Sequence, residues 1–339
     1  MMSSQGTGPA RVIHTGQVVV DVTMRVAAVP SPGAEVFADS FSLQVGGGFN
    51  VLHSIRQAGA EAVYLGPVGD GVLGRAVIEA LDRDGVEFAG ATVEGLDTGI
   101  CVALTDDTAE RTFLSTMGAE CRVPLDAFDH VELGEGDMLY VSGYSLIDDS
   151  NRAALERLAG RWVAGGGVGR VDEGGGEPGP TDTHPHGTRP RALIDTSPMI
   201  GDVPVDVLET MNGFHPIWSA NERETRILAD LFGIPADAEI PALCSSLSRR
   251  LRTTVIARVG ASGAWWSRDG SPAELVPSIP VTPVDTNGAG DAHSGVLCAL
   301  LAEGMDFERA LRVANVAAAL STTVPGPATC PARTEFLSR

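Results

Sequence analysis

A short stretch near the end of the chain combines small residues with an acid in an order that suits chemistry on an anion. It reads DTNGAGD over residues 285–291, and an apolar series typical of a buried helix follows it. At a helix start, free backbone N–H groups and the positive end of the helix dipole can bind an anion, and Gly288, Ala289 and Gly290 would let it approach. A carboxylate beside such a site repels the ligand. Asp291 therefore suits a chemical task, which is to accept the proton of a hydroxyl that attacks phosphorus.

The same stretch also has a purely structural interpretation. Asp285 could cap the helix, the glycines could form a turn, and Asp291 could complement the helix dipole. Residues elsewhere in the chain are needed to distinguish the chemical interpretation from the structural one.

A second glycine cluster, VGGGFN over residues 45–50, precedes an amphipathic helix pattern. Gly46, Gly47 and Gly48 allow close approach of a ligand to the backbone, and Asn50 can donate and accept hydrogen bonds. A turn with Asn50 as its helix cap would explain the same residues without a ligand. Upstream, Asp21 follows the apolar run VVV, and acids at the carboxyl ends of strands lie where open α/β sheets bind ligands. A turn aspartate is the alternative.

Further downstream, two polar motifs follow predicted strands. Asn221 and Glu224 have the spacing of a capping box at a helix start, and this structural role explains them fully. If the start of that helix faces a phosphate, the same residues could serve both as a cap and in phosphate binding. The predicted strand over residues 253–259 ends in Gly260 and Gly263.

In this order, the motifs resemble those of the PfkB (ribokinase-like) family of carbohydrate and nucleoside kinases. Residues 285–291 are similar to the family's second signature, in which residues 288–290 would be the anion hole and Asp291 the catalytic base. Residues 46–50 are similar to its first signature, and there the glycines and Asn50 would contact the sugar together with Asp21. Leu52 replaces the small residue of that signature, and the triple glycine replaces a pair, and both departures concern the substrate more than the fold.

The resemblance also implies a nucleotide side. Asn221 and Glu224 would lie near the phosphates and a hydrated Mg²⁺, with Glu224 holding the metal through water. Arg258 stands where the family has Thr or Lys, and it could pair with the β- or γ-phosphate. The other positions implied to contact the nucleotide are Gly260, Gly263, Asp285, Asn315 and Gly326.

Buried-strand and helix patterns alternate along the chain, beginning with a predicted strand over residues 11–20. Together with this alternation, the resemblance implies one doubly wound α/β domain over residues 11–339, in which helices flank a mostly parallel sheet. Alternating segments near 21–43 and 98–116 predict short strands, the second of them as a hairpin, and the resemblance implies that they form a small β-sheet lid. Residues 165–191 are rich in Gly and Pro and predict a flexible insertion. Asp182, His184 and His186 within it are interpreted as a solvated loop in preference to a metal site.

Composition excludes several classes of function. Of the 339 residues, 24 are basic and 44 acidic, and a net charge of -20 argues against nucleic acid and anionic membranes as partners. The chain has no lysine, which excludes a Walker A lysine and a Schiff base. The five cysteines have neither disulfide nor metal-site spacing. The sequence shows no signal peptide and no apolar run of membrane-spanning length, so we expect a soluble, cytoplasmic protein.

The expected reaction is transfer of the γ-phosphoryl group of ATP to a hydroxymethyl group of a small sugar, as in ribokinases or fructokinases, with Mg²⁺ bridging the phosphates. The sequence leaves open whether the protein uses a monovalent cation such as K⁺ and whether it forms a homodimer. A nucleoside kinase is the alternative within the same chemistry, but with 5% aromatic residues the sequence nominates no stacking surface for a base. An inactive sugar-binding regulator is the third hypothesis, and Asp291 and the Asn221 motif argue against it.

Overall fold

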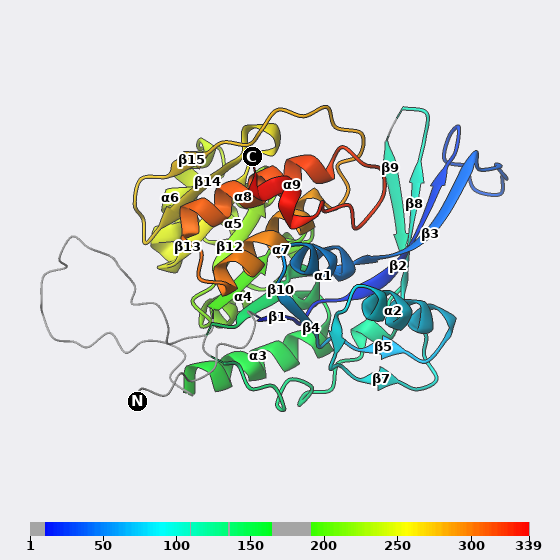
Figure 1. Cartoon of the computed structure of the whole chain (residues 1–339), viewed down its shortest axis with the longest axis horizontal. Helices are drawn as coiled ribbons and strands as arrows, with labels where there is room; N and C mark the ends of the chain where they lie inside the picture. Colours follow the sequence, from blue (N-terminus) through cyan, green and yellow to red (C-terminus); the bar gives the residue numbers. More distant parts are fainter. Residues whose placement is uncertain (1–10, 109, 135, 165–190, 339) are drawn as a thin grey trace, which may run out of the picture.

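The computed structural model describes residues 11–108, 110–134, 136–164 and 191–338. Their main sheet runs through the centre of the molecule with strands in the order β15-β14-β13-β12-β11-β10-β1-β4-β6 (Figure 1). Neighbours from β13 to β6 are parallel, whereas β14 and β15 add antiparallel pairs at one edge. The strands are β1 (Arg11–His14), β4 (Glu61–Tyr64), β6 (Glu87–Phe88), β10 (Met138–Ser142), β11 (Arg191–Asp195), β12 (Ile217–Asn221), β13 (Thr254–Arg258), β14 (Ala264–Arg268) and β15 (Glu274–Val276).

Helices cover both faces of this sheet, because successive side chains of its buried strands point to opposite sides. In β10, Met138 and Tyr140 join one apolar cluster while Leu139 and Val141 join the other. The first cluster contains α1 (Gly48–Gln57), α2 (Val72–Arg83), α7 (Ala289–Ala302), α8 (Phe307–Ser321) and α9 (Arg333–Leu337), and the second contains α3 (Asp149–Ala164), α4 (Val205–Asn212), α5 (Glu222–Leu231) and α6 (Ile240–Leu251). The predicted doubly wound α/β class is confirmed.

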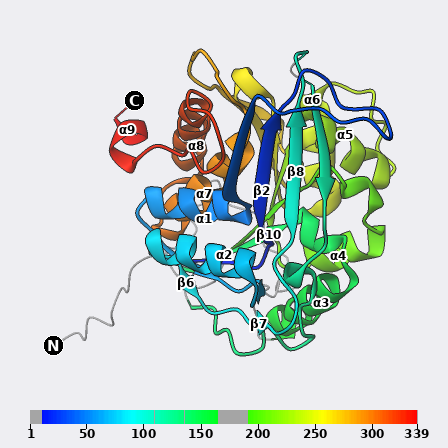
Figure 2. The same ribbon diagram turned by 90° about the vertical axis from the view of Figure 1, so that its right-hand side faces the viewer.

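A second, smaller sheet projects from one end of the molecule, as Figures 1 and 2 show. Its order is β3-β2-β8-β9, formed by β2 (Val18–Arg25), β3 (Ser40–Gly47), β8 (Ile100–Thr105) and β9 (Arg111–Ser115). Asp21 pairs with Gln44 on one side and with Cys101 on the other. We call this sheet the lid. Two short strands, β5 (Val68–Gly69) and β7 (Thr92–Val93), pair separately, and single 3₁₀ turns are η1 (Ala119–Cys121), η2 (Gly143–Leu146), η3 (Ile200–Asp202) and η4 (Gly260–Ser262).

The single strand predicted over residues 11–20 is wrong. The chain leaves the main sheet after His14 and enters the lid at Val18, so Asp21 lies inside a lid strand and not beyond the end of a core strand. The break falls at Gly16, where a Cβ atom would lie 2.7 Å from Cε1 of His14 and 2.8 Å from Cβ of Ser142. Apolar side chains continue through both strands, which is why hydrophobicity alone does not reveal the break.

The predicted insertion, with Asp182, His184 and His186, lies outside the described residues except for Arg191, which begins β11. The five cysteines are free. None of the helices in the described ranges combines the length and the apolar character needed to cross a membrane.

Candidate active site

Helix α7 begins with the turn that the sequence singled out. Its N-cap residue, Gly288, has a φ of 74°, a left-handed conformation that favours glycine, and no side chain caps the helix. Asp291 lies in the first turn. The start of α7 therefore offers backbone N–H groups and the positive end of a helix dipole directly beside a carboxylate.

Asn50 of α1 holds that carboxylate. Its Nδ2 donates a hydrogen bond of 2.9 Å to Oδ2 of Asp291, and its Oδ1 accepts one of 2.9 Å from the backbone N–H of Ala328. Burial raises the pKa of Asp291 to about 6, the hydrogen bond from Asn50 opposes this, and the negative charge of Asp195 adds to it. The sequence assigned Asn50 to the sugar, whereas the structure places its amide against the predicted base.

The glycine cluster of residues 46–48 packs closely against Asp21 and β1. A Cβ atom on Gly46 would lie 2.0 Å from Oδ2 of Asp21, and one on Gly48 would lie 2.5 Å from Cε1 of His14. Gly47 has a φ of 59°. Contacts within the protein thus explain why these positions are glycine. Burial raises the pKa of Asp21 to about 6, and the negative charge of Asp21 adds to the rise in the pKa of Asp291.

The predicted capping box forms at the start of α5. Oδ1 of Asn221 accepts from the backbone N–H of Glu224 at 2.9 Å, and Oε2 of Glu224 accepts from the backbone N–H of Asn221 at 2.9 Å. Nδ2 of Asn221 also donates to Oε1 of Glu224, and the hydroxyl of Thr196 donates to Oε2 at 2.8 Å. Glu224 is buried, and this desolvation raises its pKa.

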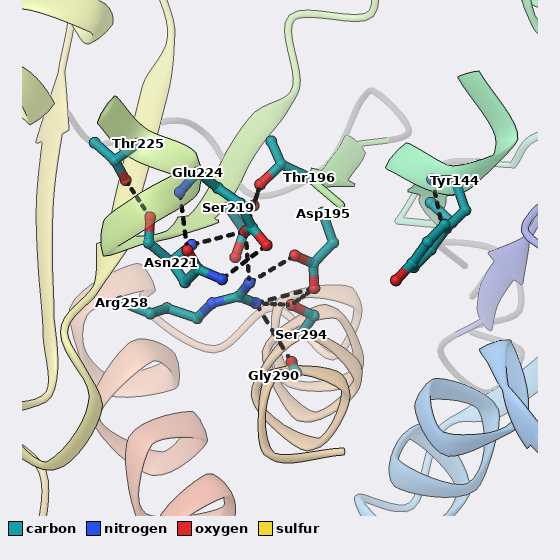
Figure 3. A network of polar contacts seen from close by, with 11 residues as sticks. Tyr144, Asp195, Thr196, Ser219, Asn221, Glu224, Thr225, Arg258, Gly290 and Ser294 are labelled. Carbon is teal, nitrogen blue, oxygen red and sulfur yellow. Dashed lines mark hydrogen bonds and ion pairs between the residues drawn. The ribbon is translucent and has the colours of Figure 1, made fainter. Parts of the chain in front are cut away.

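Arg258 lies at the centre of a polar network between the ends of β11 and β13 and the start of α7 (Figure 3). Its Nη1 and Nη2 donate to the two carboxylate oxygens of Asp195 at 2.9 and 2.8 Å. Nη1 also donates to Oγ of Ser294 at 3.1 Å and to the carbonyl of Gly290 at 3.4 Å. Nη2 is 3.8 Å from Oε2 of Glu224. The predicted pairing of Arg258 with phosphate stays a prediction, and it has to compete with these partners.

Four of the other residues predicted to contact the nucleotide form two groups. Asp285 accepts hydrogen bonds from the backbone N–H groups of Asn287 at 3.0 Å and Gly326 at 3.1 Å, which joins the approach to α7 to the loop after α8. Asn315 donates to the carbonyl of Val276 at 2.9 Å, and a Cβ atom on Gly263 would lie 2.2 Å from the same oxygen. Gly260, Gly263 and Gly326 have φ angles of 58°, 105° and 101°.

Comparison with known proteins then decides the family. The sequence pattern described as pfkB family carbohydrate kinase matches residues 10–165 and 197–334. The chain belongs to this family. It is 29% identical over 328 residues to the uncharacterized sugar kinase YegV of Escherichia coli, covering 96% of this chain and 92% of that one. It is 28% identical over 298 residues to fructokinase of Vibrio alginolyticus, covering 85% and 88%. Arabidopsis thaliana ribokinase, complexed with ribose and ATP, has the same fold with a TM-score of 0.75, 20% identity and 98% coverage of both chains.

This PfkB-family kinase places three residues at the site that the sequence analysis missed. Asp195 ends β11 beside Ser219 of β12, so the rule used for Asp21, an acid at the end of a predicted strand, could have found it. Ser294 lies three residues after Asp291, on the same side of α7. Tyr144 of η2 is 48% exposed, and the negative charges of Asp291 and Glu224 add to the burial that raises its pKa. Figure 3 shows its side chain to one side of the Arg258 network.

Proposed function

We propose that this kinase transfers the γ-phosphoryl group of ATP to a hydroxymethyl group of a small sugar, as fructokinases and ribokinases do. The observation that carries the proposal is the start of α7, where Asp291 lies in the first turn of a helix that no side chain caps and Asn50 orients its carboxylate. A base and an anion site side by side suit phosphoryl transfer.

The acceptor would lie between Asp21 of the lid and Asp291. Its hydroxyl oxygen attacks the γ-phosphorus, a new O–P bond forms, the bond between the γ-phosphorus and the bridging oxygen breaks, and ADP leaves. Asp291 accepts the hydroxyl proton. Backbone N–H groups at residues 288–290 would stabilise the transferred group, whose transition state is loose and strongly charged.

ATP would lie along the carboxyl ends of β12 and β13, next to Asn221 and to the glycine-rich turn after β13. Mg²⁺ bound to the phosphates would neutralise charge. The residues present fit such an ion through water, because Glu224 is buried and both of its oxygens already accept hydrogen bonds, while Asp195 is paired with Arg258. Glu224 would therefore orient a metal-bound water, and direct coordination is not expected.

A nucleoside is the second candidate acceptor, and Tyr144 favours it. The negative charge of Asp291 adds to the rise in the pKa of Tyr144, whose ring stands to one side of the Arg258 network in Figure 3, and Phe113 of the lid is 60% exposed. Phe113 pairs with Ala103, which pairs with Thr23, so it shares a lid face with Asp21. With both rings at the border of the proposed acceptor site, they could stack on a nucleobase.

ATP-dependent product formation over a panel of sugars and nucleosides, with and without K⁺, tests the proposal. We expect turnover with one or more free sugars that carry a hydroxymethyl group, and its loss in Asp291→Asn. Turnover restricted to nucleosides would favour the second candidate. Sugar binding in calorimetry without phosphorylation of any acceptor would support an inactive regulator and refute the kinase reaction.

A further inference from the structure

Arg258 joins three elements around the predicted base. We propose that its guanidinium is a positioning group that holds the first turn of α7 against the main sheet, and that it is not a phosphate ligand. This inference rests on the proposed function, because it concerns the alignment of Asp291. It also departs from the role that the sequence suggested for Arg258.

The guanidinium of Arg258 already binds groups of the protein, so a phosphate would have to compete with them for its N–H donors. Both of its terminal nitrogens donate to Asp195, in the fork-to-carboxylate geometry that arginine favours. Oγ of Ser294 donates to the same carboxylate at 2.6 Å and accepts from Nη1, which closes a triangle of hydrogen bonds. The Arg258 and Asp195 side chains are only 14% and 8% exposed. A buried, bidentate pair of this kind loses much when one partner leaves.

The same guanidinium reaches both sides of the base. It donates to the carbonyl of Gly290, directly before Asp291, and to the hydroxyl of Ser294, one helical turn further along. Helix α7 begins at a left-handed glycine without a side-chain cap, so its first turn lacks the usual local anchor. Arg258 and Asp195 supply an anchor from β13 and β11 instead. A displacement of about 1 Å in a reacting group can cost about 10²-fold in rate.

Variants of the pair separate this role from phosphate binding. A positioning role predicts that Asp195→Asn and Arg258→Gln each lower kcat by about 10- to 100-fold. The double variant, which keeps the net charge of the pair, should show a similar loss while its Kd for ATP stays within about two-fold of wild type. If Arg258 were a phosphate ligand, Asp195→Asn would keep kcat and the double variant would lose ATP affinity. Either of those results would overturn the proposal.

Two milder variants guard against misfolding. Ser294→Ala removes one hydrogen-bonding partner without leaving a charge unpaired, so it should fold and lower kcat in the same direction by less. Arg258→Lys keeps the charge but not the fork, and it should recover only part of the loss in Arg258→Gln. Arg250→Gln is the matched control, since its exposed ion pair with Glu209 at 2.7 Å lies outside the site. Its kcat should not change.

A readout that does not need an acceptor completes the test. Amide hydrogen exchange across residues 289–294 should quicken in Arg258→Gln, Asp195→Asn and Ser294→Ala but not in Arg250→Gln. Unchanged exchange in all of them would refute the positioning role, whether or not the protein is a kinase. A wild-type protein that phosphorylates nothing would refute the proposed function alone.

Discussion

Asp291→Asn changes the chemistry of the site with almost no change in shape. Asparagine cannot accept the hydroxyl proton, and general-base catalysis of this kind contributes about 10²- to 10⁴-fold in rate. Its amide oxygen can still accept the hydrogen bond that Nδ2 of Asn50 donates to Asp291 at 2.9 Å. The backbone groups at residues 288–290 also stay in place. We therefore expect kcat to fall by that factor, while ATP and the acceptor bind with nearly unchanged affinity.

The same substitution should stabilise the fold at neutral pH. The pKa of Asp291 lies at about 6 against an ordinary 3.8, mainly because of burial. At 1.36 kcal/mol for each pKa unit, this difference corresponds to at most about 3 kcal/mol. With an unfolding entropy of about 2.1 cal/mol/K per residue, the substitution should raise the Tm by up to about 4 °C.

The sign of the pH dependence follows from the direction of the shift. Because the folded-state pKa of Asp291 is raised, the stability that its protonation contributes is fully present below pH 3.8 and is lost as the pH rises through about 6. The advantage of Asp291→Asn should therefore be full at pH 7 and about half as large at pH 5. In the wild type, kcat/KM should fall on the acid side of about pH 6, where the base becomes protonated.

Single-turnover phosphorylation, ATP and acceptor titrations, and thermal unfolding at pH 7 and pH 5 measure these effects on one protein. Turnover within a few-fold of wild type would show that Asp291 is a helix-end carboxylate without a catalytic role. A Tm that is unchanged at pH 7 would show that the carboxylate is better solvated than its surroundings indicate. The rate and the stability thus test the mechanism and the electrostatics separately.

Three further predictions concern the acceptor and the metal. Asp21→Ala removes a carboxylate that would accept a hydrogen bond from a substrate hydroxyl, worth about 1.5–3 kcal/mol, so the affinity for the phosphoryl acceptor should fall by about one to two decades in calorimetry while ATP affinity stays unchanged. The acid limb of kcat/KM should also move to lower pH, because the charge of Asp21 raises the pKa of Asp291. An unchanged acceptor Kd would exclude Asp21 from the site. Gly46→Ala places a Cβ atom 2.0 Å from Oδ2 of Asp21, so the acceptor KM should rise and stability should fall by about 1–3 kcal/mol, whereas Gly160→Ala, with no atom within 4 Å, serves as the control that loses neither. Glu224→Gln should raise the Mg²⁺ concentration needed for half-maximal activity by about 10- to 100-fold, and an unaltered Mg²⁺ titration would contradict a role for Glu224 at the metal.

Local sequence was enough to predict the features that depend on neighbouring residues. The glycine turn before Asp291 and the capping box of Asn221 and Glu224 form as their spacing indicates. Each of these two features involves residues within one turn of helix, so a few consecutive residues determine it. The doubly wound class followed from the resemblance together with alternating strand and helix patterns.

Partners supplied by distant elements could not be predicted in this way. Asn50 is 241 residues from Asp291, and Arg258 is 63 residues from Asp195. A sequence shows that Asn50 can donate a hydrogen bond and not which acceptor the fold brings within reach. The resemblance suggested a phosphate as the partner of Arg258. The competing carboxylate of Asp195 belongs to another strand, so local sequence does not reveal it. Asp21 was placed past the end of a core strand because the break at Gly16 leaves the apolar pattern intact.

The charges around the site explain why backbone groups and a metal would have to share the work of binding a nucleotide. Asp195 and Asp21 both raise the pKa of Asp291, and Asp195 raises that of Glu224, so four carboxylates act on one another. Arg258 faces this group, but Asp195 binds it in bidentate fashion. ATP would bring still more negative charge to a chain whose net charge is already -20. Because the N–H groups at the start of α7 carry only partial positive charge, we expect a divalent cation bound to the nucleotide to supply the remainder. A water-mediated contact to Glu224 suits this demand, because it orients the cation without removing Glu224 from its capping box.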